Sequence, residues 1–122
     1  MNAGKSLLLL AAFALPAWAG DQVETIRVAA TEIRAVSDAK GVLGAQEAIF
    51  NCYRTSSSYE KCIAQDFILS NVAARSARDP MGVLSEMAER ITQAMQRQAV
   101  PLEDAKAYIL LVKEHGFAAY LQ

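Results

Sequence analysis

The chain has 122 residues, of which 53% are hydrophobic, and its 12 basic and 13 acidic residues give a formal net charge of −1. A balance so close to neutral, with both signs interspersed, provides no basic footprint for nucleic acid or for an anionic membrane surface. Length and composition therefore indicate one small globular domain and exclude nucleic-acid binding through general electrostatics.

The first residues have the layout of a secretory signal peptide. Lys5 precedes an apolar run from Leu7 to Leu15, and small residues lead to a cleavage point after Ala19. The run is about half of the roughly 20 residues that a membrane-spanning helix needs, so a retained anchor is the weaker interpretation. We expect residues 1–19 to be removed and residues 20–122 to form a periplasmic or secreted domain without stable membrane insertion.

Apolar residues recur every three or four positions through most of the mature chain, which predicts amphipathic helices. Strict alternation of apolar and polar residues, the mark of a half-buried strand, is missing there. The predicted helices run near residues 22–38, from Ala45 to Tyr53, from Ser57 to Ala73, from Pro80 to Met95 and from Pro101 to His115. We therefore expect an all-α fold, a small bundle of four to five helices.

Start signals precede several of these helices. Asp21 with Glu24, and Ser57 with Glu60, have the spacing of a capping box, in which the two side chains satisfy free backbone N–H groups reciprocally. Asp79 is followed by proline, which suits the first helical position because the N–H that it lacks would have no helical partner there. Each signal should mark the beginning of its helix.

The predicted fourth helix has one narrow apolar stripe, with Met87 on its flank. The stripe consists of Met81, Leu84, Ala88, Ile91 and Met95. Glu86 and Arg90 have the i,i+4 spacing and the favourable order of an ion pair on the outward face.

The last predicted helix contains an ambiguous stretch. Residues 107–112, AYILLV, are apolar on all sides and fit either a helix or a buried strand. Start and stop signals bracket the region, which favours the helix. Gly116 should end it, with Phe117 folding back onto the last turn.

The two cysteines flank the break between the second and third predicted helices. Nine residues separate Cys52 from Cys62, a spacing that lets two antiparallel helices bring the sulfurs together. Export to an oxidising compartment makes a disulfide the default for an even cysteine count, so we predict a Cys52–Cys62 disulfide. Intermolecular pairing and redox chemistry are the alternatives. Redox chemistry is disfavoured because thiol oxidoreductases place Cys-X-X-Cys at a helix start.

The chain has few groups for catalysis. His115 is its single histidine, so any Ser-His-Asp or Cys-His mechanism must use it. A position in the last turn of a helix, where positive charge is favoured, explains this residue without catalysis. The serines at 56–58 are interpreted as turn and cap residues. We expect no catalytic residue, no metal and no cofactor, and a weak hydrolase acting through His115 is the minor alternative.

Two sets of apolar residues suit partner binding. Met81 and Met87 have the flexible thioethers that adaptable grooves use, although core packing is the alternative. Phe117, Tyr120 and Leu121 are apolar residues near the C-terminus, where they either pack back or offer an aromatic anchor to a partner.

An apparent leader, a helical domain and one cysteine pair resemble, in kind only, small exported bacterial binding proteins, such as immunity proteins and accessory factors of secretion or conjugation machines. The expectation is a protein-binding module that works by surface complementarity, with another protein as its partner. An inhibitor or immunity protein against a secreted effector is one such role. An assembly factor of a secretion or conjugation machine and a carrier of a small apolar ligand are the alternatives, and an enzyme is the least favoured.

Overall fold

The computed structural model describes the backbone of residues 17–122 and the side chains from Asp21 onward. The predicted signal peptide, residues 1–19, lies almost wholly outside the described residues, so its removal stays a prediction. The helical elements are α2 (Ala17–Thr55), α3 (Tyr59–Ala74), α4 (Pro80–Arg97), α5 (Leu102–Leu111), the π-helical turn η1 (Val112–Gly116) and α6 (Phe117–Tyr120). No strand occurs in this range, and the all-α prediction is confirmed.

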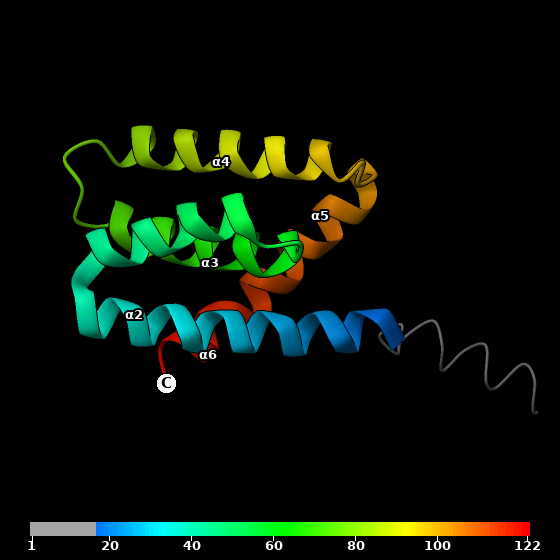
Figure 1. Cartoon of the computed structure of the whole chain (residues 1–122), viewed down its shortest axis with the longest axis horizontal. Coiled ribbons are helices and arrows are strands. Elements are labelled where there is room, and N and C mark those ends of the chain that lie inside the picture. The colour runs from blue at the N-terminus through cyan, green and yellow to red at the C-terminus, as the bar shows by residue number, and fades with distance from the viewer. Residues whose placement is uncertain (1–16) are drawn as a thin grey trace, which may run out of the picture.

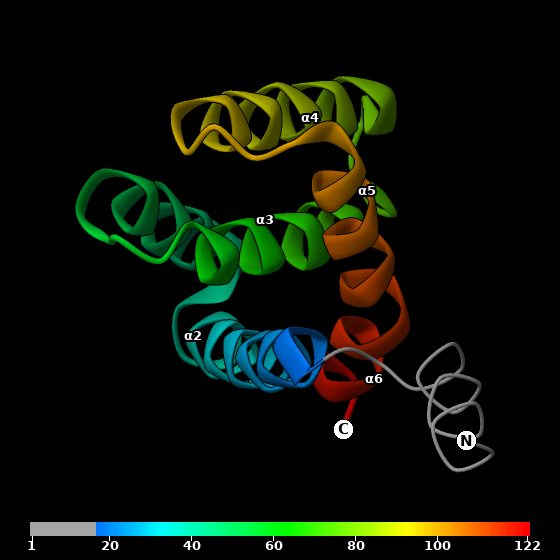
Figure 2. The same ribbon diagram turned by 90° about the vertical axis from the view of Figure 1, so that its right-hand side faces the viewer.

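The helices form layers, as Figures 1 and 2 show from two directions. The N-terminal part of α2 forms one outer layer, α3 lies in the middle, and α4 forms the opposite outer layer. From the end of α4 the chain crosses back through α5 and η1 to α6, which lies against α2. Helix α4 packs mainly on α3 and makes few contacts with α5, so α4 and α5 diverge.

Helix α2 is bent at Gly41. The backbone there has φ 76° and ψ −179°, a region that essentially only glycine occupies, and the helix resumes directly afterwards. The bend lets residues 42–55 turn back beside α3 (Figure 1). The predicted break between the first two helices is therefore a single-residue bend. The helix also begins at Ala17, so the capping-box prediction at Asp21 is wrong.

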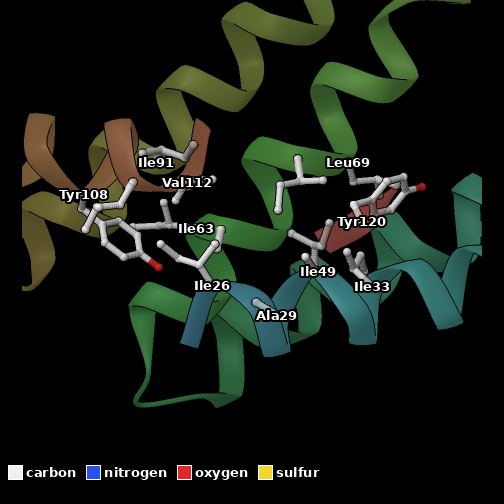
Figure 3. Packing of buried hydrophobic residues seen from close by; sticks show 14 of the residues in the cluster. Ile26, Ala29, Ile33, Ile49, Ile63, Leu69, Ile91, Tyr108, Val112 and Tyr120 are labelled. Atoms are coloured by element: carbon white, nitrogen blue, oxygen red, sulfur yellow. The ribbon is translucent and has the colours of Figure 1, made fainter. Parts of the chain in front are cut away.

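The core lies between α2, α3 and the C-terminal elements (Figure 3). Ile26 and Ile33 of α2 and Ile63 of α3 belong to this core, and all three side chains are almost completely buried. Burying each of them contributes about 1.5–3 kcal/mol relative to exposure. The buried Ala29 lies between the two isoleucines of α2, where its small side chain lets α3 approach closely enough for Gln65 to donate to the Ala29 carbonyl at 3.2 Å.

The N-cap of helix α3 lies one residue later than predicted. Ser58 is the N-cap residue and makes no side-chain capping bond, and its own N–H donates to Ser56 Oγ at 3.0 Å. The predicted capping box of Ser57 and Glu60 is therefore wrong. Three adjacent serines offer equivalent hydroxyls, and here the turn before the helix uses the first of them.

Residues 107–112 are helical, as predicted: α5 covers them up to Leu111 and η1 follows. Gly116 does not end the helix, because its backbone is helical (φ −71°) and α6 continues from it. Its role is close packing. A methyl group added at Gly116 would lie 2.7 Å from Ile68 Cδ1, so any larger residue would force the buried Ile68 side chain to shift.

Helix α4 begins as predicted, with Pro80 at its first position and Asp79 accepting from the Gly82 N–H at 3.0 Å. Its apolar face is rotated from the predicted stripe. Met87 is buried, whereas Met81 and Ala88 of the predicted stripe are exposed. The buried residues are Met87, Ile91, Ala94 and Met95, with Leu84 half-buried.

Candidate functional site

A buried carboxylate joins α4 to the rest of the molecule. Asp66 of α3 is 1% exposed and accepts four hydrogen bonds. Arg90 of α4 donates two of them, from Nε at 2.9 Å and from Nη2 at 2.8 Å. Tyr53 Oη and Ser70 Oγ donate the other two, each at 2.8 Å. These four residues, called the Asp66 cluster, satisfy the carboxylate from three helices.

Electrostatics in the Asp66 cluster keep the phenol and the guanidinium protonated. Burial, and then the negative charge of Asp66, raise the pKa of Tyr53 well above its usual range, so the phenol stays a donor. The hydrogen bond to Asp66 raises the pKa of Arg90, although burial opposes this. The guanidinium carbon also lies 5.2 Å from the centroid of the Phe50 ring, which covers it. The cluster is therefore a fully paired clamp.

The expected outward pair of Glu86 and Arg90 is wrong, because Arg90 points inward to Asp66. The i,i+4 spacing of Glu86 and Arg90 on α4 could not by itself reveal that Arg90 points inward. The available signal was Asp66 itself, a carboxylate between the apolar residues Ile63 and Leu69, since a charged group on a buried face needs an opposite charge.

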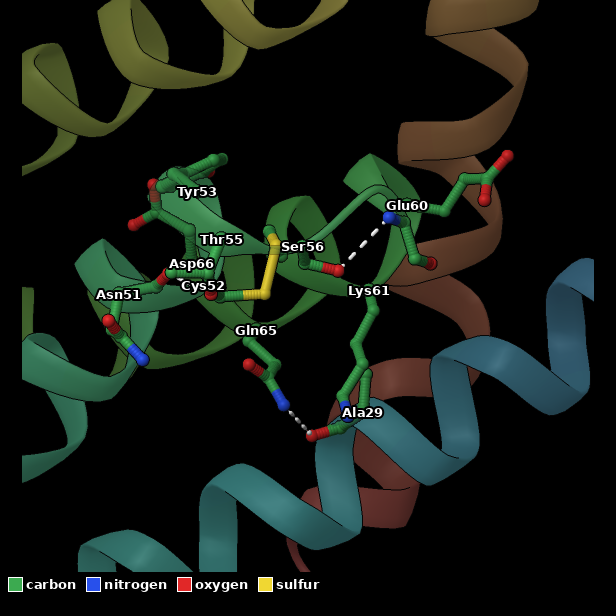
Figure 4. Close-up of a disulfide and its surroundings, with 12 residues drawn as sticks. Ala29, Asn51, Cys52, Tyr53, Thr55, Ser56, Glu60, Lys61, Gln65 and Asp66 are labelled. Carbon is green, nitrogen blue, oxygen red and sulfur yellow. Dashed lines mark hydrogen bonds between the residues drawn. A yellow bond between two sulfur atoms is a disulfide. The ribbon is translucent and has the colours of Figure 1, made fainter.

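The predicted disulfide is confirmed: Cys52 and Cys62 are bonded, with their Cα atoms 5.6 Å apart (Figure 4). It joins the end of α2 to the first turn of α3, and Cys62 is buried. Figure 4 shows Tyr53 and Asp66 next to this bond. The disulfide and the Asp66 cluster therefore fix the same corner of the molecule.

The divergence of α4 and α5 leaves an apolar groove of about 670 Å³, called the α4–α5 groove. Its α4 wall is formed by Ile91, Thr92, Met95 and Gln96. Its other wall is formed by Leu102, Ala105, Lys106, Ile109, Leu110 and Lys113, with Val100 at the closed end. This volume is within the range of known ligand sites.

A left-handed residue between the two helices helps to open the groove. Helix α4 ends in a Schellman turn, in which the Val100 N–H donates to Met95 O and the Ala99 N–H donates to Gln96 O, both at 3.0 Å. Ala99 has φ 53°, which is uncommon for a residue with a side chain. After this turn, α5 runs at a steep angle to α4, as Figure 2 shows.

The groove is open to solvent and apolar along its α5 edge. Leu102 is 68% exposed and Leu110 is 56% exposed. Large exposed apolar side chains that line one groove mark an interaction site more strongly than scattered ones. The groove is therefore the best candidate binding surface among the described residues.

A smaller pocket of about 310 Å³ adjoins the groove through Lys113, which lines both. This adjacent pocket is also lined by Phe67, Asn71, Arg75 and Phe117. The Phe67 and Phe117 rings meet edge to face, with centroids 6.0 Å apart, and Lys113 Nζ lies 6.0 Å from the Phe67 centroid.

The five residues predicted to bind a partner are dispersed. Met81 (73% exposed) lies at the first turn of α4, and Met87 is in the core. Phe117 is half-buried in the adjacent pocket. Tyr120 is buried, and Leu121 is exposed. None of the five lines the α4–α5 groove, which the sequence reasoning missed.

The C-terminal residues pack back on α2. Arg34 donates to the Tyr120 carbonyl at 2.6 Å, and its guanidinium carbon lies 5.2 Å from the centroid of the Tyr120 ring. Of the two interpretations of this segment, the contacts favour packing for Tyr120 and leave Leu121 at the surface.

His115 lies in η1, in a shallow pocket that also contains Arg27 and Thr31. Its Nε2 atom is 3.8 Å from a carboxylate oxygen of Glu114. The Thr31 hydroxyl donates to the Arg27 carbonyl within α2. Within residues 17–122 no three His, Cys, Asp or Glu side chains gather as a metal-binding group.

Across the same part of the chain, no helix combines the length and hydropathy needed to cross a membrane. No protein-family model matches the chain, and comparisons with curated proteins and with solved structures give no match.

Proposed function

We propose that this protein is an exported protein-binding module that captures a segment of its partner in the α4–α5 groove. The observation that carries the proposal is the exposure of Leu102 and Leu110 on one wall of a groove of about 670 Å³. The clamped corner formed by the disulfide and the Asp66 cluster supports it, because a rigid surface loses less conformational entropy on binding. Inhibition of a secreted effector is the role that best fits such a preorganised surface.

Site-specific photo-crosslinking in cells tests the proposal. A photoreactive amino acid replaces Leu110 in the groove, and a matched variant carries it at Leu43, which is 80% exposed near the bend of α2 and outside the groove. We expect a protein adduct at Leu110 and none at Leu43. Equal adducts at both positions, or none at Leu110, would contradict the proposal.

The groove volume also favours a second candidate, the carriage of a small apolar ligand. Native mass spectrometry of the exported protein separates the two. A retained lipid that is lost in a Leu110→Lys variant would favour the carrier, and unliganded protein would favour the protein-binding module.

A further inference from the structure

The α4–α5 groove and its adjacent pocket carry positive charge, although the whole chain has a net charge of −1. The charged residues that line them are Lys106, Lys113 and Arg75, and none of the lining residues is acidic. All three basic residues are exposed. The local charge is therefore opposite in sign to that of the whole chain.

We propose that the segment captured by the groove is an acidic amphipathic helix of about three turns, with its apolar face between α4 and α5 and two carboxylates facing Lys106 and Lys113. The inference rests on the proposed protein-binding function and names the chemistry of the partner. It follows from the length of the groove, the spacing of the two lysines and the exposure of the walls.

The length of the groove fits a short helix. The wall formed by α5 and η1 runs from Leu102 to Lys113, twelve residues, and the eleven steps between them span about 16 Å at 1.5 Å per residue. An α-helix of about three turns has the same length. Helices bind such grooves through apolar side chains at i, i+3, i+4 and i+7, which would meet Ile91 and Met95 on one wall and Leu110 on the other.

The two lysines set the charge pattern. Lys106 of α5 and Lys113 of η1 are seven residues apart, about 10 Å at 1.5 Å per residue, and both line the groove wall. On a bound helix, residues i and i+7 have the same separation and lie on one face. Glu103 is 3.7 Å from Lys106, but with 85% of the glutamate and 62% of the lysine side chain exposed, this pair leaves the ammonium free to exchange partners.

A single fatty acid fits less well. It has one carboxylate for two separated lysines, and its chain would leave both Leu102 and Leu110 partly in water, since these side chains are more than half exposed on the rim. A bound helix would cover both Leu102 and Leu110 with side chains from its successive turns.

The test uses the full chain, expressed with its own leader and purified after export. The probe is a displayed library of helical peptides of about four turns. Leucines are fixed on one face, and two positions that are two turns apart vary among Glu, Gln and Lys. The same selection is made on a Lys106→Glu/Lys113→Glu variant and on a Lys40→Glu variant, whose substitution lies on α2 outside the groove.

We expect Glu at both variable positions with the wild-type protein and with Lys40→Glu, and Lys at both positions with the doubly reversed variant. Changing either groove lysine to Gln should lower the affinity for the selected peptide about two- to five-fold, and high salt should lower the affinity further. Glu103→Gln should strengthen binding by a similar factor, because it removes the competing carboxylate.

Selection of Gln or Lys at the variable positions by the wild-type protein would overturn the inference. Selection of the same residues by the wild-type protein and by the doubly reversed variant would also overturn it. Failure of every peptide to bind would also overturn it, as would displacement of the selected peptides by oleate without any effect of the lysines. A Leu110 crosslink to a protein combined with any of these results would refute the acidic helix and leave the protein-binding function standing.

Discussion

Loss of the Arg90 guanidinium should strongly destabilise the attachment of α4 to α3. In Arg90→Met, the buried Asp66 keeps two hydroxyl donors and loses both charge-assisted hydrogen bonds and the compensating positive charge. Removing one partner of a buried ion pair costs about 3–5 kcal/mol. Because the Arg90 side chain is 27% exposed, water screens part of this energy, and we expect about 3 kcal/mol.

The assay is urea unfolding of four proteins: wild type, Arg90→Met, Asp66→Asn and the double variant. A double-mutant cycle isolates the pair, and its coupling energy should be about 2 kcal/mol. Arg27→Met, an exposed position on α2, is the matched control and should change the free energy of unfolding by less than about 0.5 kcal/mol. If Arg90→Met is as harmless as the control, or if the coupling is negligible, α4 does not depend on the Asp66 cluster.

Three further outcomes follow from the structure. In urea unfolding, Gly41→Ala should lower the free energy of unfolding by about 1–3 kcal/mol, because a residue with a side chain is strained at the backbone angles of Gly41. Ala99→Gly should raise the free energy of unfolding by about 1 kcal/mol, because glycine adopts φ 53° without strain. Equal effects of the two substitutions would contradict this reasoning. Reduction of Cys52–Cys62 should cost about 2.5 kcal/mol, and thiol labelling without reduction would show that the bond is absent. Burial raises the pKa of Tyr108 above its ordinary 10.0, because the buried phenol resists ionisation in the folded state. The contribution of Tyr108 to the free energy of unfolding is therefore complete below pH 10. Above pH 10 the unfolded chain ionises first, and this contribution falls by up to about 1.4 kcal/mol per pH unit. Tyr108→Phe should therefore flatten the decline in the urea midpoint between neutral and strongly alkaline pH.

Local signals predicted the features that depend on neighbouring residues in the chain. The cap at Asp79, the helical state of residues 107–112 and the Cys52–Cys62 disulfide all follow from spacing and composition, and the structure confirms each one. Capping by Ser57 failed because adjacent serines compete for one turn.

Features that depend on packing between helices were not predictable in the same way. Positions 87 and 88 of α4 both continue an i,i+3/i+4 pattern, and only contact with α3 decides that Met87 is buried and Ala88 exposed. Arg90 was assigned to the surface for the same reason, since Asp66 lies 24 positions away in the sequence.

The α4–α5 groove belongs to this second group. Leucine is usually a core residue, so the sequence does not reveal that Leu102 and Leu110 are exposed. The sequence also contains no sign that the chain turns away from α4 at Ala99. A left-handed alanine has no sequence signature, whereas the glycine at 41 does. The groove is thus set by a backbone turn and not by the residues that line it.

Because α4 packs mainly on α3 and is held at one corner by the Asp66 cluster, local opening of this outer layer can occur while the interior stays folded. Local opening of this kind defines a separate cooperative unit, whose amide hydrogens exchange with solvent sooner than those of the central helix. A ligand between α4 and α5 would slow the exchange of the α4 amides first. Hydrogen exchange measured for each amide would therefore show whether the groove is occupied, even without any other structural change.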